Sequence, residues 1–399
     1  MAGAILTALM PPPSVAQVVT DGTLGPAQTV PGPDRQIPQA LGTTVGRNLF
    51  HSFRRFDVPA GESATFQGPA GLHAIVSRVT GGTASRIDGR LASTAPNADV
   101  YLLNPAGVLF GPGARADVPG SLHVATADHL RMADGTRVSA TAAMPTLSVG
   151  APAAFGFLGD GNGLPLGRRL IAIDGSSLAF AKGATITLAA GRIEVDAGAD
   201  PVIEAEDGSL RLIAVAGPGE VPIRGTGSTV ARYGPVILRG AADGGGADEA
   251  DEADDDDDDD DDGGDDAPDP AIDLGGETGG TAVLRAGTLT IRDFSIAADT
   301  QGDGTAPLTA VDILAQRTLR IDGESQIASI ASGAGRAGDL LIRGGRLALA
   351  GDADDWLASV GAGLRWRIAP RIGMELYLAQ PLIDHRAPGE TALQDYGVH

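Results

Sequence analysis

The sequence of 399 residues contains no cysteine, and aromatic residues make up only 4% of it. The absence of cysteine excludes a disulfide scaffold, a zinc site with cysteine ligands and thiol catalysis. No stretch reaches the roughly 18 apolar residues of a transmembrane helix. The Gly-x-Ser-x-Gly, His-Glu-x-x-His and phosphate-loop signatures are also missing. Nothing in the sequence therefore points to a familiar catalytic motif.

Basic residues are scarce, with 29 Lys and Arg against 51 Asp and Glu. Nineteen of the acidic residues lie between Asp243 and Glu277, a segment without Lys or Arg, so the remaining 32 nearly balance the basic ones. A nucleic-acid-binding face needs clustered basic residues, and no such cluster is present. We expect no nucleic-acid partner and a folded part that is almost neutral.

The acidic segment contains nine consecutive aspartates, Asp254 to Asp262. A run of like charges repels itself and has no apolar surface to bury, which predicts a solvated loop. Weak cation binding is the alternative, but the segment lacks the spaced ligands of a calcium loop. We therefore expect no metal and no cofactor.

Glycine is abundant at 58 residues, and short strands with alternating polarity recur between glycines. The segments 184–188, 209–213, 288–291, 318–321 and 346–349 all show this period of two, which predicts half-buried β-strands. Leu289, Leu319 and Leu347 stand at matching positions 30 and 28 residues apart. This loose repeat favours a parallel β-helix, in which successive coils stack on a common core. A β-sandwich with irregular loops is the alternative.

The two ends of the chain differ from its centre. Residues 1–16 are apolar and end in Ser-Val-Ala, which is typical of a signal peptide, although no basic residue precedes the apolar run. An apolar tail is the alternative. Residues 359–368 and 372–378 alternate apolar and polar positions around a turn, which predicts a β-hairpin. Such a hairpin fits a membrane strand pair or, with less difficulty, a cap on the solenoid, because one hairpin cannot close a barrel.

Three blocks between Gly46 and Asp128 carry the most specific pattern: GRNLFHSFRRFDVPAGESATF, IVSRVTGGTASRIDGRL and DVYLLNPAGVLFGPGARADVPGSLHVATAD. This region resembles the two-partner secretion domain, the haemagglutination-activity domain of filamentous haemagglutinin-like exoproteins. The resemblance covers about residues 20–160, and weaker coils follow to about 351. It implies a right-handed parallel β-helix and secretion across the outer membrane by a partner transporter with periplasmic recognition modules.

The family's Asn-Pro-Asn-Gly motif falls on Asn104, Pro105, Ala106 and Gly107, so this chain lacks the second asparagine. From the residues alone we expect Asn104 to bond backbone two residues on, and Gly107 to take a positive φ. Val108, Leu109 and Phe110 should then form a short buried strand that ends at Gly111. A folding corner explains much of the motif, and the resemblance adds transporter recognition through Asn104, Pro105, Gly107, Val108, Phe110 and Gly111. The family's upstream Asn-Pro motif would fall near residues 68–71, where its asparagine is absent.

The histidines are His51, His73, His123, His129, His385 and His399, and none lies in a catalytic pattern. We interpret His51 as a turn or core residue rather than a base, and the loop at Asp160 as a plain turn rather than a cation site.

The C-terminal tail carries a second resemblance. The residues from Gly361 to Leu382, followed by LQDYGVH, resemble the closing strands of the partner transporter's barrel. This resemblance suggests a gene fusion that left the tail as a relic.

These features predict a secreted or cell-surface, non-enzymatic, adhesin-like monomer that contacts its transporter and, in addition, a host or cell-surface glycan or protein. A β-helix carbohydrate-active enzyme and an outer-membrane-anchored surface protein are the alternatives. The predicted fold is all-β, with a right-handed parallel β-helix, a disordered acidic insertion and a C-terminal amphipathic β-hairpin. The expected divisions are a signal-peptide remnant (1–16), a secretion domain (17–165), coils (166–240), an acidic loop (241–280), further coils (281–351) and a hairpin tail (352–399).

Overall fold

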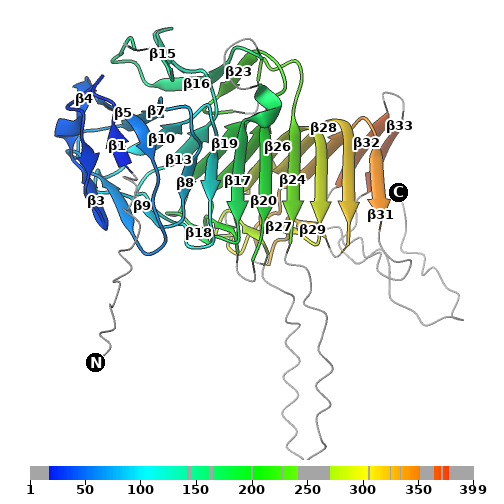
Figure 1. Ribbon diagram of the computed structural model, residues 1–399. Helices are drawn as coiled ribbons and strands as arrows, with labels where there is room; N and C mark the ends of the chain where they lie inside the picture. Colours follow the sequence, from blue (N-terminus) through cyan, green and yellow to red (C-terminus); the bar gives the residue numbers. More distant parts are fainter. Residues whose placement is uncertain are drawn as a thin grey trace, which may run out of the picture.

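The structure is a computed structural model that describes residues 18–141, 143, 145–160, 165–198, 201–225, 228–240, 270–303, 306–323, 325–332, 334–350, 364–369 and 372–376. In these residues the chain forms β-strands, and its helical turns are two short 3-10 segments, η1 (Gln39–Leu41) and η2 (Leu166–Arg168). The predicted all-β class is confirmed. The strands stack along one axis, with the N-terminal strands at one end (Figure 1).

Parallel pairing between successive coils builds a first ladder of strands. It runs through β5 (Asn48–Phe56), β7 (Ala74–Val79), β10 (Asp99–Leu103), β13 (Leu122–Ala125), β19 (Thr185–Ala190), β22 (Ser209–Ala214), β26 (Thr281–Arg292), β28 (Thr309–Asp322) and β30 (Asp339–Gly344).

A second ladder of parallel strands follows the first one along each coil. It contains β8 (Ser85–Ile87), β11 (Val108–Phe110), β17 (Leu170–Asp174), β20 (Arg192–Asp196), β24 (Pro235–Arg239), the later halves of β26 and β28, and β31 (Leu347–Ala350).

The remaining side is built from shorter strands that also pair in parallel. The early coils contribute β3 (Asp34–Ile37), β6 (Ser63–Phe66), β9 (Arg90–Ser93) and β12 (Arg115–Asp117). The later coils contribute β18 (Leu178–Ala179), β21 (Ile203–Glu204), β25 (Ile272–Asp273), β27 (Ser295–Ala297) and β29 (Gln326–Ala328).

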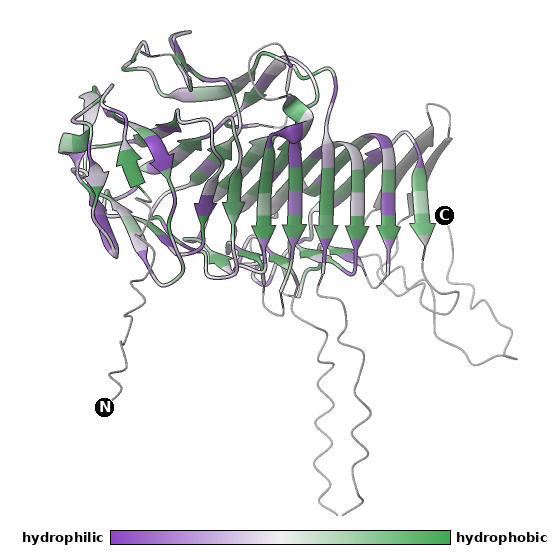
Figure 2. Cartoon of the chain, viewed as in Figure 1, coloured by the Kyte–Doolittle hydropathy of each residue, from purple (hydrophilic) through white to green (hydrophobic). Residues whose placement is uncertain are grey.

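The core is a stack of aliphatic side chains in register. Leu289 pairs with Leu319, and Leu319 pairs with Leu347, so the repeat expected from their spacing is confirmed. Because every coil places an apolar residue above the last one, the interior is a continuous apolar column. Figure 2 shows apolar residues continuing from strand to strand along this stack.

Antiparallel strands close the N-terminal end. The strand β1 (Val18–Thr20) pairs with β2 (Thr29–Val30) and β5, and β4 (Gly42–Val45) pairs with β5. At the other end β32 (Leu364–Ala369) pairs parallel with β30 and antiparallel with β33 (Ile372–Leu376). The amphipathic character expected for this second pair stays a prediction, because its side chains lie outside the described part.

A four-stranded antiparallel sheet, here called the cover sheet, lies over the outer face of the first ladder. It has the order β15 (Arg137–Ser139), β14 (His129–Met132), β16 (Pro152–Phe157) and β23 (Gly219–Pro222). Between the two layers lies a second apolar cluster that includes Tyr101, Leu130, Phe155 and Ile213. A buried ion pair joins Arg169 and Asp128 at 2.8 Å. It links the residue before β14 to the segment that follows β16.

The predicted divisions stay predictions, and strand pairing continues across the one at residue 165. Val108 pairs with Ile171 across this division, so the two segments share a ladder. The strand β25 lies inside the segment 241–280 that was predicted as an acidic loop, so the coils resume earlier than expected. The Asp254–Asp262 run and the signal-like residues 1–16 lie outside the described residues.

Candidate functional site

The motif at Asn104 forms the corner between β10 and β11. The Asn104 side chain is fully buried, and its Nδ2 donates to the Thr83 carbonyl and to Ser85 Oγ, both at 3.0 Å. Its Oδ1 accepts the Ala106 N–H at 3.0 Å, so the predicted bond to backbone two residues on is present. One side chain therefore fixes its own turn and the preceding coil at the same time.

Backbone conformation explains the glycine that follows. Gly107 has a φ of +123°, which side chains rarely adopt, and a Cβ there would lie 2.9 Å from the Leu170 carbonyl oxygen. Its N–H donates to the Asn104 carbonyl at 3.0 Å. The expected positive φ is confirmed, and the chain enters the short strand β11.

The strand β11 is the predicted buried segment. Val108 and Phe110 point into the core and are at most 2% exposed, whereas Leu109 is half-buried. Pro105 is half-buried in the turn before it. The strand pairs with β8 on one side and with β17 on the other, so the motif lies within the ladder rather than at an end of it.

The second corner depends on close approach to Asp88. A Cβ on Gly111 would lie 2.4 Å from Asp88 Oδ1, and one on Gly113 would lie 2.3 Å from the Asp88 carbonyl oxygen. Asp88 Oδ1 also accepts the Gly113 N–H at 3.0 Å. The two corners predicted around a three-residue strand are both present, and their glycines make room for the preceding coil.

Burial limits which residues of the Asn104–Gly107 motif another protein can contact. Asn104, Gly107, Val108, Phe110 and Gly111 are all buried in the folded chain. Ala106, where the family has asparagine, is half-buried, and its backbone N–H already serves the turn. Their structural role is visible, and a role in transporter recognition stays a prediction.

Two histidines are core residues. His51 in β5 is 1% exposed and lies against Phe66, with ring centroids 5.6 Å apart, so its interpretation as a core residue is confirmed. Burial lowers the pKa of His51 to about 4. His123 stacks on Tyr101 beneath the cover sheet, and its Nδ1 lies 3.0 Å from Thr187 Oγ1. Burial, aided by two nearby arginines, lowers its pKa to about 3.

The loop at Asp160 is the one alternative cation site that the described residues reach, because the Asp254–Asp262 run lies outside them. Asp160 Oδ1 accepts the Leu166 N–H at 2.8 Å, which suits a plain turn, and residues 161–164 lie outside the described part. No group of His, Asp or Glu side chains in the described ranges is placed to hold a metal ion.

The described residues contain no helix that is long and apolar enough to cross a membrane.

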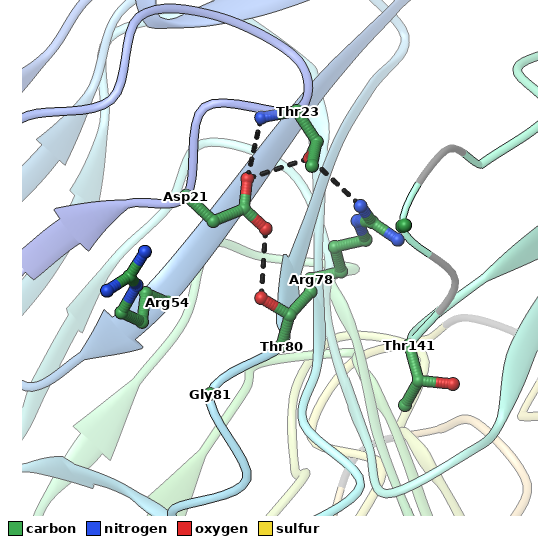
Figure 3. A pocket seen from close by; sticks show the side chains of 8 residues that line it. Asp21, Thr23, Arg54, Arg78, Thr80, Gly81 and Thr141 are labelled. Carbon is green, nitrogen blue, oxygen red and sulfur yellow. Dashed lines mark hydrogen bonds between the residues drawn. The ribbon is translucent and has the colours of Figure 1, made fainter.

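A pocket that sequence reasoning missed lies where the N-terminal strands meet the cover sheet (Figure 3). It has a volume of ≈ 430 Å³ and is lined by Asp21, Thr23, Arg54, Arg78, Thr80, Gly81, Thr141 and Ala143. These residues come from segments more than a hundred positions apart and form no motif in the sequence. Only the folded arrangement brings them together.

The wall of this pocket contains the Asp21 carboxylate, which accepts four hydrogen bonds. Asp21 accepts bonds from the Thr23 N–H at 2.9 Å, from the Thr23 hydroxyl at 2.7 Å, from Ser52 at 2.5 Å and from Thr80 at 2.9 Å. Burial would raise the pKa of Asp21, but these bonds favour its charged form and the pKa lies below its usual value. Asp21 is thus a fixed anion.

Arg78 crosses the same wall and is 2% exposed. It donates to Ser52 Oγ in β5 at 2.8 Å, to Thr23 Oγ1 after β1 at 2.9 Å and to the Ser139 carbonyl in β15 at 3.1 Å. Burial lowers the pKa of Arg78, and the Asp21 carboxylate opposes that effect. One guanidinium therefore joins the N-terminal strands, the first coil and the cover sheet.

The model of the TPS secretion domain family matches residues 16–263, which is more than half of the chain. The chain belongs to this two-partner secretion family. A heme/hemopexin-binding protein of Haemophilus influenzae is 31% identical over 128 residues, which are 29% of this chain and 13% of that protein. The chain thus spans a small part of that relative's length.

Two solved structures are also similar to this TPS chain. The filamentous hemagglutinin secretion domain has 17% identity and a TM-score of 0.35, over 84% of this chain and 97% of that one. The HMW1 secretion domain from Haemophilus influenzae has 14% identity and a TM-score of 0.38, over 84% of this chain and 80% of that one.

Proposed function

We propose that this protein is a non-enzymatic exoprotein, exported through the periplasm and across the outer membrane by a partner transporter that recognises its N-terminal β-helix domain. The observation that carries the proposal is the TPS secretion domain over residues 16–263, together with the corner that Asn104 and Gly107 build inside it. The proposed function outside the cell is adhesion to a glycan or protein surface.

The fold that we propose is a right-handed parallel β-helix with a terminal hairpin. Parallel pairing in register, from Ile75 through Val100 and Leu122 to Ile186, supports it. In such a solenoid each coil adds to the preceding one, so folding can proceed along the chain as it leaves the transporter. Folding outside the cell would then favour export in one direction.

A non-enzymatic role agrees with the surroundings of two of the histidines. His51 and His123 are buried and neutral near pH 7, and neither faces the pocket at Arg54. General acid–base catalysis needs such a group within reach of a substrate. These two histidines therefore offer no accessible base, and their burial supports a role in the core.

The test is co-expression of the full chain with a partner transporter of the two-partner secretion type in a Gram-negative host. The chain should appear in the medium or on the cell surface with the transporter, and it should stay in the periplasm without it. Retention in the periplasm in both cases would contradict the proposed export. Turnover of acidic polysaccharides by the secreted chain would contradict the non-enzymatic role.

A further inference from the structure

The cover sheet is held to the first ladder mainly by side chains. Its four strands pair with one another, and the ladder beneath pairs coil to coil without them. The contact between the two layers is the second apolar cluster, which includes Tyr101 and Leu103 from the ladder and Leu130, Phe155 and Val221 from the sheet. The cover sheet can therefore separate without breaking the ladder's own backbone hydrogen bonds.

One histidine lies inside this contact. His123 follows Leu122, which points into the inner core, so the His123 ring points to the opposite side of β13. The ring is 2% exposed and stacks on Tyr101, with ring centroids 4.5 Å apart. The charged groups that act on it are Arg211 in β22 and Arg224 after β23. A proton on His123 would therefore add a third cation between the two layers.

A second histidine packs on the opposite face of the cover sheet. His129 precedes Leu130, whose side chain lies in the apolar contact, so the His129 ring points outward. It is nevertheless only 6% exposed, because the ring packs on Gly156 of β16, where a Cβ would lie 2.1 Å from His129 Nε2. That nitrogen has no hydrogen-bond partner among the described residues. The ring is thus buried without a bond that would stabilise its charged form.

Four charged groups act on His129. Arg131 and Arg137 are a cross-strand pair in β14 and β15. Glu220 of β23 accepts a bond from Arg131 at 2.7 Å, and Asp128, the residue before His129, has its own buried cation partner. Because both carboxylates already have a cation, a proton on His129 would leave an excess of positive charge on this face.

The stacked coils differ from the cover sheet in this respect. No histidine occurs between His129 and His385, so the coils built from residues 166–350 contain none. Of the two other described histidines, His51 lies in the inner core of the first coil and His73 is exposed. Histidine is the side chain whose ordinary pKa lies closest to neutral pH. A moderate fall in pH therefore acts on both faces of the cover sheet and leaves most of the coils unaffected.

We propose that the cover sheet is an acid-sensitive layer, which separates from the first ladder when His123 and His129 take up protons, while the stacked coils stay folded. The separation would expose the apolar face around Tyr101 and Phe155 only in acid. This device goes beyond the proposed export, because it acts in the folded chain after secretion.

The direction of the pH effect follows from burial. Burial lowers the pKa of His123 to about 3, and burial together with Arg137 also lowers the pKa of His129 below its ordinary value of 6.5. In the separated layer both rings meet water, so both pKa values return towards 6.5 and protons favour the open form. The closed form is therefore fully favoured above pH 6.5 and loses its advantage as the pH falls below that value.

The experiment follows hydrogen exchange of the full-length chain by mass spectrometry from neutral to acid pH, with the intrinsic exchange rate corrected at each pH. In the original chain β14 and β16 should lose protection at a pH about 1 unit or more above the pH at which β26 and β28 lose it. His123→Gln combined with His129→Gln should lower this first transition by about 1 pH unit or more, because neither side chain then titrates. His73→Gln is the matched control, and it should leave both transitions unchanged because His73 is exposed.

Two results would overturn the inference. Loss of protection at one common pH in the cover sheet and in β26 and β28 would show that the sheet is not a separable layer. A first transition that keeps its original pH in the double variant would assign the opening to other groups. If the double variant is unprotected at neutral pH, His129→Gln alone decides, because the His129 ring lies outside the apolar contact. The inference then requires that this single variant also lowers the first transition.

Discussion

Replacement of Asn104 by alanine tests whether the motif corner holds the fold. The substitution removes the hydrogen bonds to Thr83, Ser85 and Ala106 at a site with 0% exposure. Each buried bond contributes about 1 kcal/mol, and a buried partner left unpaired costs a further 1–3 kcal/mol. Because three bonds are lost and Ser85, which is 1% exposed, is left without its Asn104 partner, we expect a loss of about 3–5 kcal/mol in the free energy of unfolding.

Urea unfolding followed by far-UV circular dichroism measures this loss. The two tryptophans, Trp356 and Trp366, lie far along the chain from the corner, so their fluorescence is a poor monitor of it. Amide exchange at the early coils provides a local measurement, and protection should fall in β8, β11 and β17 before it falls in β28.

Ala106→Asn is the matched control, because it restores the asparagine of the family motif one turn position away. Ala106 is half-buried and its N–H bond to Asn104 does not depend on its side chain, so the change should stay within about 0.5 kcal/mol. A loss below about 1 kcal/mol for Asn104→Ala, combined with abolished secretion, would refute the structural reasoning and assign the motif to direct recognition.

Three further predictions concern buried groups. His51 and His123 have pKa values of about 4 and about 3 when folded, below the ordinary 6.5, so stability should be full above pH 6.5 and fall as the pH drops towards 3–4. At pH 5 the loss is about 2 kcal/mol for each group, which urea midpoints at pH 7.5 and 5 will measure, and a flat profile in this window would contradict it. Arg169→Met leaves Asp128 buried without its cation and should cost about 3–5 kcal/mol, seen as earlier proteolysis of the cover sheet. Gly191→Ala places a Cβ 1.5 Å from the Leu166 carbonyl oxygen and should abolish accumulation of folded chain. Gly183→Ala is its control, because a Cβ there meets open space and lowers stability only through the strain of a positive φ.

Local pattern was enough to predict the stacked strands. The alternation around Leu289, Leu319 and Leu347 identifies both the strands and the repeat, because each strand has one buried face and each coil repeats the previous one. The turn at Asn104 was also predictable, since its hydrogen bond spans two residues. These features depend on neighbours in the sequence.

The cover sheet and the pocket depend on distant contacts, and no local pattern predicts them. The strand β23 pairs with β16, so Phe155 meets Val221 across 66 positions of the chain. In the sequence Arg78 is an ordinary polar position in β7, yet its side chain donates to the Ser139 carbonyl in the cover sheet. Periodicity distinguishes an inward from an outward face, but it does not show that another layer covers the outward one.

The inner core and the apolar cluster under the cover sheet are completed by residues at different positions in the sequence. The inner core gains one layer with each coil, so the pairing of Val108 with Ser85 needs no residue beyond the early coils. The outer cluster includes Tyr233 and packs against Leu314, and the fourth strand of the cover sheet begins at Gly219. In export that starts from the N-terminus, the early coils can therefore fold while the cover sheet is still incomplete. The Arg169–Asp128 pair would hold the base of that sheet during this interval, because both partners lie before β23 in the sequence. The Arg169–Asp128 ion pair can therefore form before β23 is available to complete the cover sheet.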